Sequence, residues 1–281
     1  MATQGPGAAH AVGVDDDAEP RGFTEFLRRW QRLLLGLLGA VVVLAAWQIC
    51  SDLKIVNPAF ASNPLQIIEA FHAYFTPAGG GWYALQVSAT EFGLGFVLSL
   101  AVGLLIGFAM GWLRWFEYLV DPLVNFGYAA PRIALVPLLV IWFGIGTPSK
   151  VAVVFLSAVF PIIINTASGV KIADASLLQV SRSFKASSLQ QIRTVVIPGA
   201  MPSIVTGIRL GIGQGLIGMV VGELLASTAG LGYTIETAGN NLQSPTMFVA
   251  VVLVSGIGVI LTQSIRILER RLDQWRPGAA R

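Results

Sequence analysis

Long runs of apolar residues recur six times along this sequence. A helix needs about 20 mostly apolar residues to cross a bilayer, and the runs approach or exceed that length. They do not alternate between apolar and polar residues, as the strands of a membrane barrel would. The pattern therefore predicts an all-α, polytopic membrane protein with six transmembrane helices. The predicted spans are approximately 33–50, 87–112, 118–143, 150–170, 203–226 and 246–265, and the third of them is broken by Pro131 and Pro137.

The composition agrees with a membrane location. Hydrophobic residues make up 54% of the 281 residues and charged residues only 12%, whereas a soluble domain has about 25% charged residues. A mean hydropathy of +0.71 excludes a disordered chain, a collagen-like chain and a nucleic-acid-binding protein. Cys50 is the only cysteine, so no intrachain disulfide or cysteine metal cluster can form. We expect no metal site and no nucleic-acid partner.

The placement of Lys and Arg residues predicts the orientation. With six spans, 14 of the 18 cations fall on the side that holds both termini, and only Lys54 and Lys150 fall on the other. Positively charged loops face the cytoplasm, so both termini are predicted there. The first run is longer than a signal-peptide core and lacks a clear cleavage site, so we interpret it as an uncleaved helix.

Two domains follow from this organisation. Residues 1–22 are rich in Ala, Gly, Pro and Asp and predict a disordered cytoplasmic tail. Residues 23–281 form the predicted transmembrane domain. Outside the membrane, residues 63–71 carry apolar residues at helical spacing and predict a short surface helix.

A long basic loop at 171–200 is the most informative segment on the cytoplasmic side. It predicts two short amphipathic helices with a corner near 184–186, because Ser187 and Gln190 form a capping-box pattern that begins the second helix. One interpretation is an interfacial hairpin that covers the bundle. The other is a docking element in which Phe184 projects between Arg182 and Lys185, since aromatic residues and Arg are favoured at interface centres.

The same loop resembles the cytoplasmic motif of the membrane subunit of binding-protein-dependent ABC importers. That motif reads Glu-x-Ala-x-x-x-Gly, then nine residues, then apolar-x-apolar-Pro. Its register falls here on Gln179, Ser181, Lys185 and the segment 195–198. The spacing is intact, but Gln replaces Glu, Ser replaces Ala and Lys replaces Gly.

Other segments resemble the nitrate/sulfonate/taurine branch of this family. Together they cover roughly residues 85–275, and their agreement in order is more specific than any one alone. They are 131–138 (PRIALVPL), 142–150 (WFGIGTPSK), 160–169 (FPIIINTASG), 203–210 (SIVTGIRL), 222–233 (GELLASTAGLGY) and 268–275 (LERRLDQW).

The resemblance implies a type I ABC importer permease fold in a bacterial cytoplasmic (inner) membrane. It also implies that two permease copies pair, with a homodimer as the simpler expectation. Each copy would dock a cytoplasmic ATPase through the loop, and an extracytoplasmic solute-binding protein would deliver a small, anionic solute such as a sulfonate, taurine, nitrate or a related organic acid. The implied docking residues are Gln179, Ser181, Arg182, Ser183, Phe184, Lys185, Ala186 and Pro198.

ATP chemistry is expected on another polypeptide. The sequence has no Gly-x-x-x-x-Gly-Lys-Ser/Thr phosphate-binding loop, so ATP and Mg²⁺ would be held by the partner ATPase. We therefore expect this chain to bind no cofactor of its own and not to be an enzyme. Besides protein partners, it contacts membrane lipid.

Ionisable residues within the spans are candidates for the translocation pathway. Arg132 follows Pro131, about 14 residues into the third predicted span, roughly 21 Å along a helix. It either bonds carbonyls that the proline frees or presents a positive charge to an anionic solute. Glu91 and Glu223 lie near the outer ends of their spans, where each either lines the pathway or has a structural role such as capping a loop.

Glycines four residues apart predict close helix packing, notably Gly103, Gly107 and Gly111 in the second span. A similar cluster lies at Gly211–Gly218 in the fifth span.

Two other functions remain possible from the sequence. An ATP-independent secondary transporter or channel would need coupling-ion sites and often an internal repeat, yet the carboxylates in or bordering the spans are only Glu91, Asp121 and Glu223. A membrane-bound enzyme would need a cluster of catalytic groups, which the pattern lacks.

Overall fold

The computed structural model describes residues 21–54, 62–172 and 175–273, and the chain divides into two units, residues 1–55 and 56–281. The boundary follows the first predicted span, within the region 23–281 that was predicted as one domain. The described part of the first unit is mainly one helix, α1 (Arg21–Asp52). Apolar side chains on α1 such as Leu35 and Val43 are exposed, as expected for a helix that faces lipid. The predicted tail lies outside the described residues, except that Arg21 and Gly22 begin α1.

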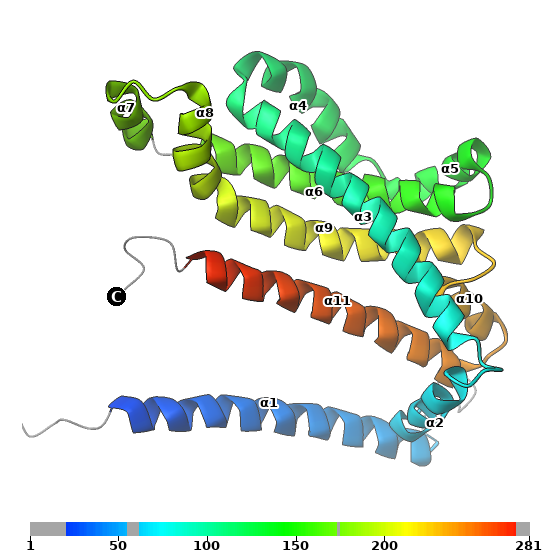
Figure 1. Ribbon diagram of the computed structural model, residues 1–281. Helices are drawn as coiled ribbons and strands as arrows, with labels where there is room; N and C mark the ends of the chain where they lie inside the picture. The colour runs from blue at the N-terminus through cyan, green and yellow to red at the C-terminus, as the bar shows by residue number, and fades with distance from the viewer. Residues whose placement is uncertain (1–20, 55–61, 173–174, 274–281) are drawn as a thin grey trace, which may run out of the picture. The chain divides into compact units, whose positions relative to one another are not determined.

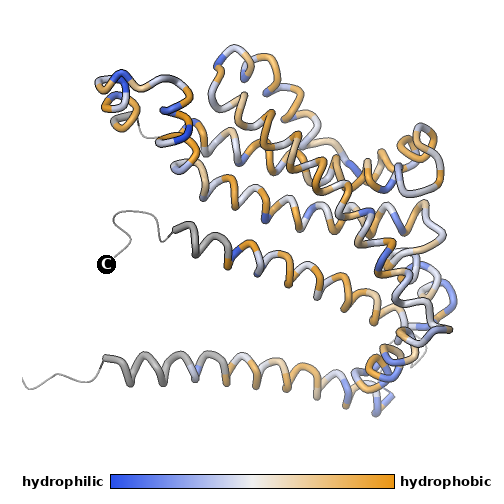
Figure 2. The backbone as a smooth tube through the Cα atoms, in the orientation of Figure 1, coloured by the Kyte–Doolittle hydropathy of each residue, from blue (hydrophilic) through white to orange (hydrophobic). Residues whose placement is uncertain are grey.

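Every regular element in the described ranges is helical, which confirms the all-α prediction. Figure 1 shows these helices, and Figure 2 shows that apolar residues dominate the long ones and polar residues gather at their ends. The elements of the second unit are α2 (Pro64–Tyr74), α3 (Gly81–Trp112), α4 (Arg114–Ala129), the 3-10 turn η1 (Arg132–Leu135), α5 (Val136–Phe143), α6 (Thr147–Lys171), α7 (Ala175–Ser183), α8 (Ser188–Gln191), the π-helical turn η2 (Ile192–Val196), α9 (Ile197–Ala226), α10 (Leu231–Asn240) and α11 (Ser244–Asp273).

The third predicted span differs from a continuous helix. Five helices of the described chain are long and apolar enough to cross a membrane, and the number is six when the pair Arg114–Ala129 and Arg132–Phe143, bent by 90°, is counted as one broken span. Ala130 precedes Pro131 and has an extended backbone (φ −60°, ψ 137°), because a proline disfavours the helical conformation of the residue before it. Arg132 therefore lies in a turn just after the break, and the prediction of its position along one helix was wrong.

Helix α6 lies between α3 and α9 and forms the centre of the second unit (Figure 1). The glycines of α3 face α6 so closely that a Cβ on Gly103 would lie 2.8 Å from the Ile162 side chain. On the other face of α6, a Cβ on Gly207 would lie 2.8 Å from the Asn165 Cβ. Small residues permit this approach, so the packing predicted from glycine spacing is confirmed.

A second packing cluster closes the end of the bundle at α2 and α10. Tyr74, Ala84, Leu231 and Val249 are buried together there. The predicted surface helix is confirmed as α2, whose start is capped by the Asn63 side chain accepting from the Gln66 N–H at 2.8 Å. The Tyr74 hydroxyl hydrogen-bonds Thr234 at 2.8 Å, which ties α2 to α10. Burial raises the pKa of the Tyr74 phenol above its ordinary value.

The glycine contact predicts opposite effects of one substitution at two positions of α3. Gly107→Ala should destabilise the protein by about 1–3 kcal/mol, because the new Cβ would lie 2.7 Å from the Ile163 carbonyl oxygen. Gly93→Ala is the matched control, since its Cβ meets no atom within 4 Å and alanine favours the helix by up to about 1 kcal/mol. Thermal unfolding in detergent, followed by tryptophan fluorescence, measures both. Equal melting temperatures for the two variants would contradict the packing argument.

Candidate functional site

The corner of the loop at 171–200 is a hydrogen-bonded turn between α7 and α8. The Lys185 N–H donates to the Arg182 carbonyl at 2.8 Å, and the Ala186 N–H donates to the Ser181 carbonyl at 3.0 Å. This pair of bonds is the Schellman arrangement that ends many helices. The next helix begins at once, because Ser187 and Gln190 form the predicted capping box. The two-helix loop and its corner are therefore confirmed.

Lys185 occupies the position of the corner at which a glycine is usual. Its φ is +54°, in the left-handed region. A side chain in that region costs about 1–2 kcal/mol because its Cβ approaches the backbone carbonyl. The glycine of the importer motif would avoid this cost, so the structure keeps the turn of the motif although the residue differs.

One face of the loop is anchored and the other is open. Leu178 and Val196 pack against Trp112 and Val170, at the ends of α3 and α6. On the open face, Phe184 at the tip is 84% exposed. Among the other predicted docking residues, Gln179, Arg182, Ser183 and Lys185 are exposed, Ser181 and Ala186 are half-buried, and Pro198 lies exposed at the start of α9.

The connection from the loop to α9 runs through the π-helical turn η2. The Ile197 N–H bonds the Ile192 carbonyl, five residues back. Pro198 follows and has no N–H to continue the regular ladder. The conserved spacing from corner to proline in the importer motif thus corresponds here to α8 and one π-helical turn, which leads directly into the fifth span.

A buried ion pair lies at the opposite end of α6. The Lys150 Nζ lies 3.1 Å from the Glu91 Oε1, and the two side chains are 6% and 1% exposed. Lys150 also donates to the Ser227 hydroxyl at 2.9 Å, and Thr147 donates to Glu91 at 3.3 Å. The charge pattern alone had placed Lys150 among the cations of the outer loops. The nearest sequence signal was Glu91, an unexplained carboxylate at the same end of a neighbouring span.

Glu223 is fully buried and holds the start of α10. Its carboxylate accepts from the Ser88 hydroxyl at 2.7 Å and from the Gly232 N–H at 2.6 Å. Ser88 in turn accepts from the Leu231 N–H at 2.8 Å. Glu91 and Glu223 therefore bond inside the subunit and tie α3, α6, α9 and the loop before α10 together. Their assignment to the translocation pathway stays a prediction.

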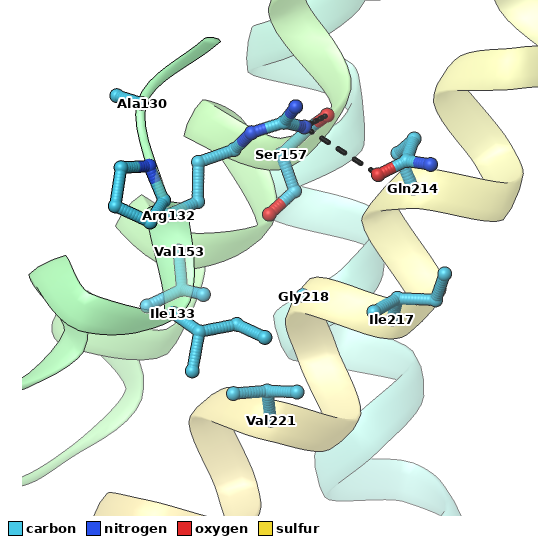
Figure 3. Close-up of a pocket in the computed structure, with 10 residues that line it drawn as sticks. Ala130, Arg132, Ile133, Val153, Ser157, Gln214, Ile217, Gly218 and Val221 are labelled. Atoms are coloured by element: carbon cyan, nitrogen blue, oxygen red, sulfur yellow. Dashed lines mark hydrogen bonds between the residues drawn. The ribbon is translucent and has the colours of Figure 1, made fainter. Parts of the chain in front are cut away.

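Arg132 borders a pocket of about 240 Å³ near the middle of α6 and α9 (Figure 3). Its Nη1 donates to the Ser157 carbonyl at 3.1 Å and to the Gln214 Oε1 at 3.5 Å, and its Nη2 donates to the Tyr128 carbonyl at 3.1 Å. The remaining lining residues are mostly apolar: Ala130, Pro131, Ile133, Val153, Ile217, Gly218 and Val221.

Prolines explain why these carbonyls are available to Arg132. Pro161 has no N–H to bond the carbonyl four residues earlier, which is that of Ser157. The Tyr128 carbonyl lies in the last turn of α4, where carbonyls lack helical partners. Arg132 therefore bonds one carbonyl that Pro161 frees and one at the end of α4, where the expectation had been carbonyls freed by Pro131, and it also lies on a pocket wall. Gln214 was not predicted, although an amide within an apolar span was an available signal.

The buried ion pair of Lys150 and Glu91 predicts a large loss of stability when one of the two charges is removed. Lys150→Met should destabilise the protein by about 3–5 kcal/mol, because Glu91 would remain charged and unpaired inside the fold. The double variant Lys150→Met with Glu91→Leu removes both charges and should recover most of that loss. Melting temperatures of the purified chains in detergent measure the effect. A single variant as stable as the unmodified chain would contradict it.

The strained corner predicts that glycine stabilises the loop. Lys185→Gly and Lys185→Ala both remove the charge, but only glycine relieves the positive φ. Relief of about 1 kcal/mol of backbone strain stabilises the closed corner, so the corner should open roughly fivefold less readily in the glycine variant. Hydrogen exchange of the corner amides measures this difference between the two variants. Faster exchange in the glycine variant than in the alanine variant would show that the corner is not strained.

Comparisons with known proteins agree with this geometry. The sequence profile of the binding-protein-dependent transport system inner membrane component family matches residues 99–274. A putative aliphatic sulfonates transport permease protein of Bacillus subtilis (strain 168) is 35% identical over 241 residues, 86% of this chain and 87% of that protein. The taurine transport system permease protein of Escherichia coli (strain K12) is 32% identical over 253 residues, 89% of this chain and 91% of that protein.

The fold also matches a solved transporter. The inward-facing MetNI methionine ABC transporter aligns with a TM-score of 0.54 at 20% identity, over 68% of this chain and 93% of the matched chain. This likeness supports the type I importer permease fold. With the family profile and the two permeases, it leads to one conclusion: the chain belongs to the inner membrane component family of binding-protein-dependent transport systems, and is an ABC transporter permease.

Proposed function

We propose that this chain is the permease subunit of an ATP-driven ABC importer and forms the pathway for a small anionic solute of the sulfonate or taurine type. The names of the two permease relatives support this solute class. The sequence carries no phosphate-binding loop, so the ATPase is a separate subunit that holds ATP and Mg²⁺. A homodimer of this chain completes the pathway.

The observation that carries the proposal is the cytoplasmic corner. Phe184 is a large apolar side chain held at the tip of a hydrogen-bonded turn, with Arg182 and Lys185 exposed beside it. Such an aromatic tip with a basic rim suits a groove on a protein partner that also offers acidic residues. The capping box and the Schellman bonds pre-organise it, which reduces the entropy lost on binding.

The anchoring of the loop gives docking a mechanical consequence. Because Leu178 and Val196 pack against Trp112 and Val170, a displacement of the corner moves the ends of α3 and α6. The π-helical turn passes the same displacement to α9. ATP-driven closure of two ATPase subunits would therefore reorient the helices that surround the Arg132 pocket.

The two ends of the second unit fit the proposed orientation. The loop end carries basic residues on α4, α6 and the α7–α8 loop, which supports a cytoplasmic location for this end and for both termini. The solute-binding protein then meets the opposite end, formed by α2, the α9–α10 loop and α10. The membrane is the bacterial inner membrane, consistent with the family description.

The docking role predicts a specific loss of partner binding. Phe184→Asp should reduce ATPase co-purification at least about tenfold, because a charge replaces the apolar tip. Phe184→Leu is the matched control and should retain most binding, since it keeps an apolar tip at a site with no buried neighbours to disturb. Pull-down of the chain from its native membrane in mild detergent, with quantification of the bound ATPase, measures both. Unchanged recovery with Phe184→Asp would refute docking through this corner.

A further inference from the structure

We propose that the Arg132 pocket is a monoanion-binding station inside the permease, and that Gln214 tunes it. The proposal concerns a site on this chain, and it relies on the proposed function only for the choice of a sulfonate as the solute. Its starting point is an unneutralised charge. Among the described residues, no carboxylate lies within ion-pair distance of Arg132, and its hydrogen bonds go only to neutral acceptors.

A positive charge held at this depth is costly without an anion. Ser157 lies near the middle of α6 and Gln214 near the middle of α9, so the pocket lies far from either end of these spans. Cations within membrane segments usually pair with a carboxylate or mark a solute pathway. The three hydrogen bonds leave two of the five guanidinium N–H groups for another acceptor from outside the described chain.

The bonds of Arg132 also position it. The two carbonyls freed by the helix end and by Pro161 hold the guanidinium from two sides, and the Tyr128 ring lies 5.5 Å from it. The guanidinium is therefore fixed on the pocket wall before any solute arrives. A pre-organised donor pair binds a planar or tetrahedral oxyanion without the entropy cost of ordering a flexible side chain.

The other lining residues indicate the chemistry of the part of the ligand that the guanidinium does not bind. Beyond the guanidinium, the Gln214 amide and Ser157, the lining is apolar and includes Ile133, Ile217 and Val221 (Figure 3). Its volume of about 240 Å³ lies below the roughly 300–1,000 Å³ of ordinary ligand sites. These features fit a single negative head group on a short apolar body, such as a short alkanesulfonate, and disfavour cations and bulky solutes.

Gln214 supplies a second test of the same idea. Its Oε1 lies 3.5 Å from the Arg132 Nη1 and is neutral, so it orients the guanidinium without cancelling its charge. A glutamate has nearly the same shape but carries a negative charge. Gln214→Glu should therefore form an internal ion pair with Arg132 and displace the anion, without emptying or reshaping the pocket.

Binding of trifluoromethanesulfonate to the full chain in nanodiscs tests the proposal directly. Broadening of the ¹⁹F resonance reports binding of this monoanion. We expect broadening with the unmodified chain, competition by ethanesulfonate, and no competition by dimethyl sulfone, which is neutral and of similar size. Arg132→Gln and Gln214→Glu should each lower the affinity at least about tenfold, whereas Arg132→Lys should retain part of it. Arg114→Gln removes an exposed Arg at the start of α4 and serves as the charge-matched control.

Several results would overturn the proposal. They are equal broadening in the unmodified chain and in folded Gln214→Glu, equal competition by dimethyl sulfone, or a loss in Arg114→Gln as large as in Arg132→Gln. The readout needs neither ATP nor a partner subunit. Failure of ATPase co-purification would therefore count against the proposed importer function alone, and failure of Arg132-dependent binding would count against this site alone.

Discussion

The close contact of α3 and α9 with α6 is the constraint on which the rest of this structure depends. In lipid, helices gain little from burying apolar surface, so van der Waals packing between small residues carries much of their association. Glycines on the contact faces, such as Gly103 and Gly107 of α3 and Gly207 of α9, bring both helices against α6, with almost no room for a Cβ. A shift of either helix would disturb every feature that α6 helps to form.

Three sets of contacts lie along α6. Lys150 near its start pairs with Glu91 of α3 and also donates to Ser227 in the loop before α10. Ser157 near its middle offers a carbonyl to Arg132 and lines the pocket. Val170 near its end supports the α7–α8 loop. A displacement of that loop can therefore reach the pocket and the opposite end of α6 through one packed helix.

Prolines place irregular backbone where it is useful. Non-helical backbone within a membrane is tolerated where it is buried in protein or lines a cavity. The break at Pro131 and the missing N–H of Pro161 both leave carbonyls facing Arg132, which satisfies them. The same residues thus solve a folding problem and hold a positive charge beside the pocket.

Much of this architecture could be predicted from the sequence, because local patterns determine it. Hydrophobic runs gave the spans, glycine spacing gave the packing faces, and Ser187 with Gln190 gave the start of α8. The 90° bend at Pro131 was predicted only as a break, since the direction of a helix after a proline depends on its tertiary neighbours. The pairing of Lys150 with Glu91 joins residues 59 positions apart, and no local pattern specifies such a contact.

The pocket shows the same difference between residues that a local pattern identifies and residues that only the tertiary structure brings together. Arg132 was identified because a charge in an apolar span is conspicuous, whereas Gln214, 82 positions away, became relevant only when α9 was placed beside the break. The importer motif has a glycine at the position of Lys185, but only the structure shows that the backbone there keeps a positive φ although the residue is a lysine.

ATP-dependent uptake by the reconstituted complex tests the central claim most directly. The purified permease with its co-purified ATPase would be placed in proteoliposomes, with ATP on the side of the α7–α8 loop and the solute-binding protein on the other. We expect uptake of radiolabelled taurine or ethanesulfonate that requires ATP and stops when hydrolysis is blocked by vanadate. Uptake that proceeds without ATP, driven by an ion gradient alone, would contradict the account and identify an ATP-independent transporter.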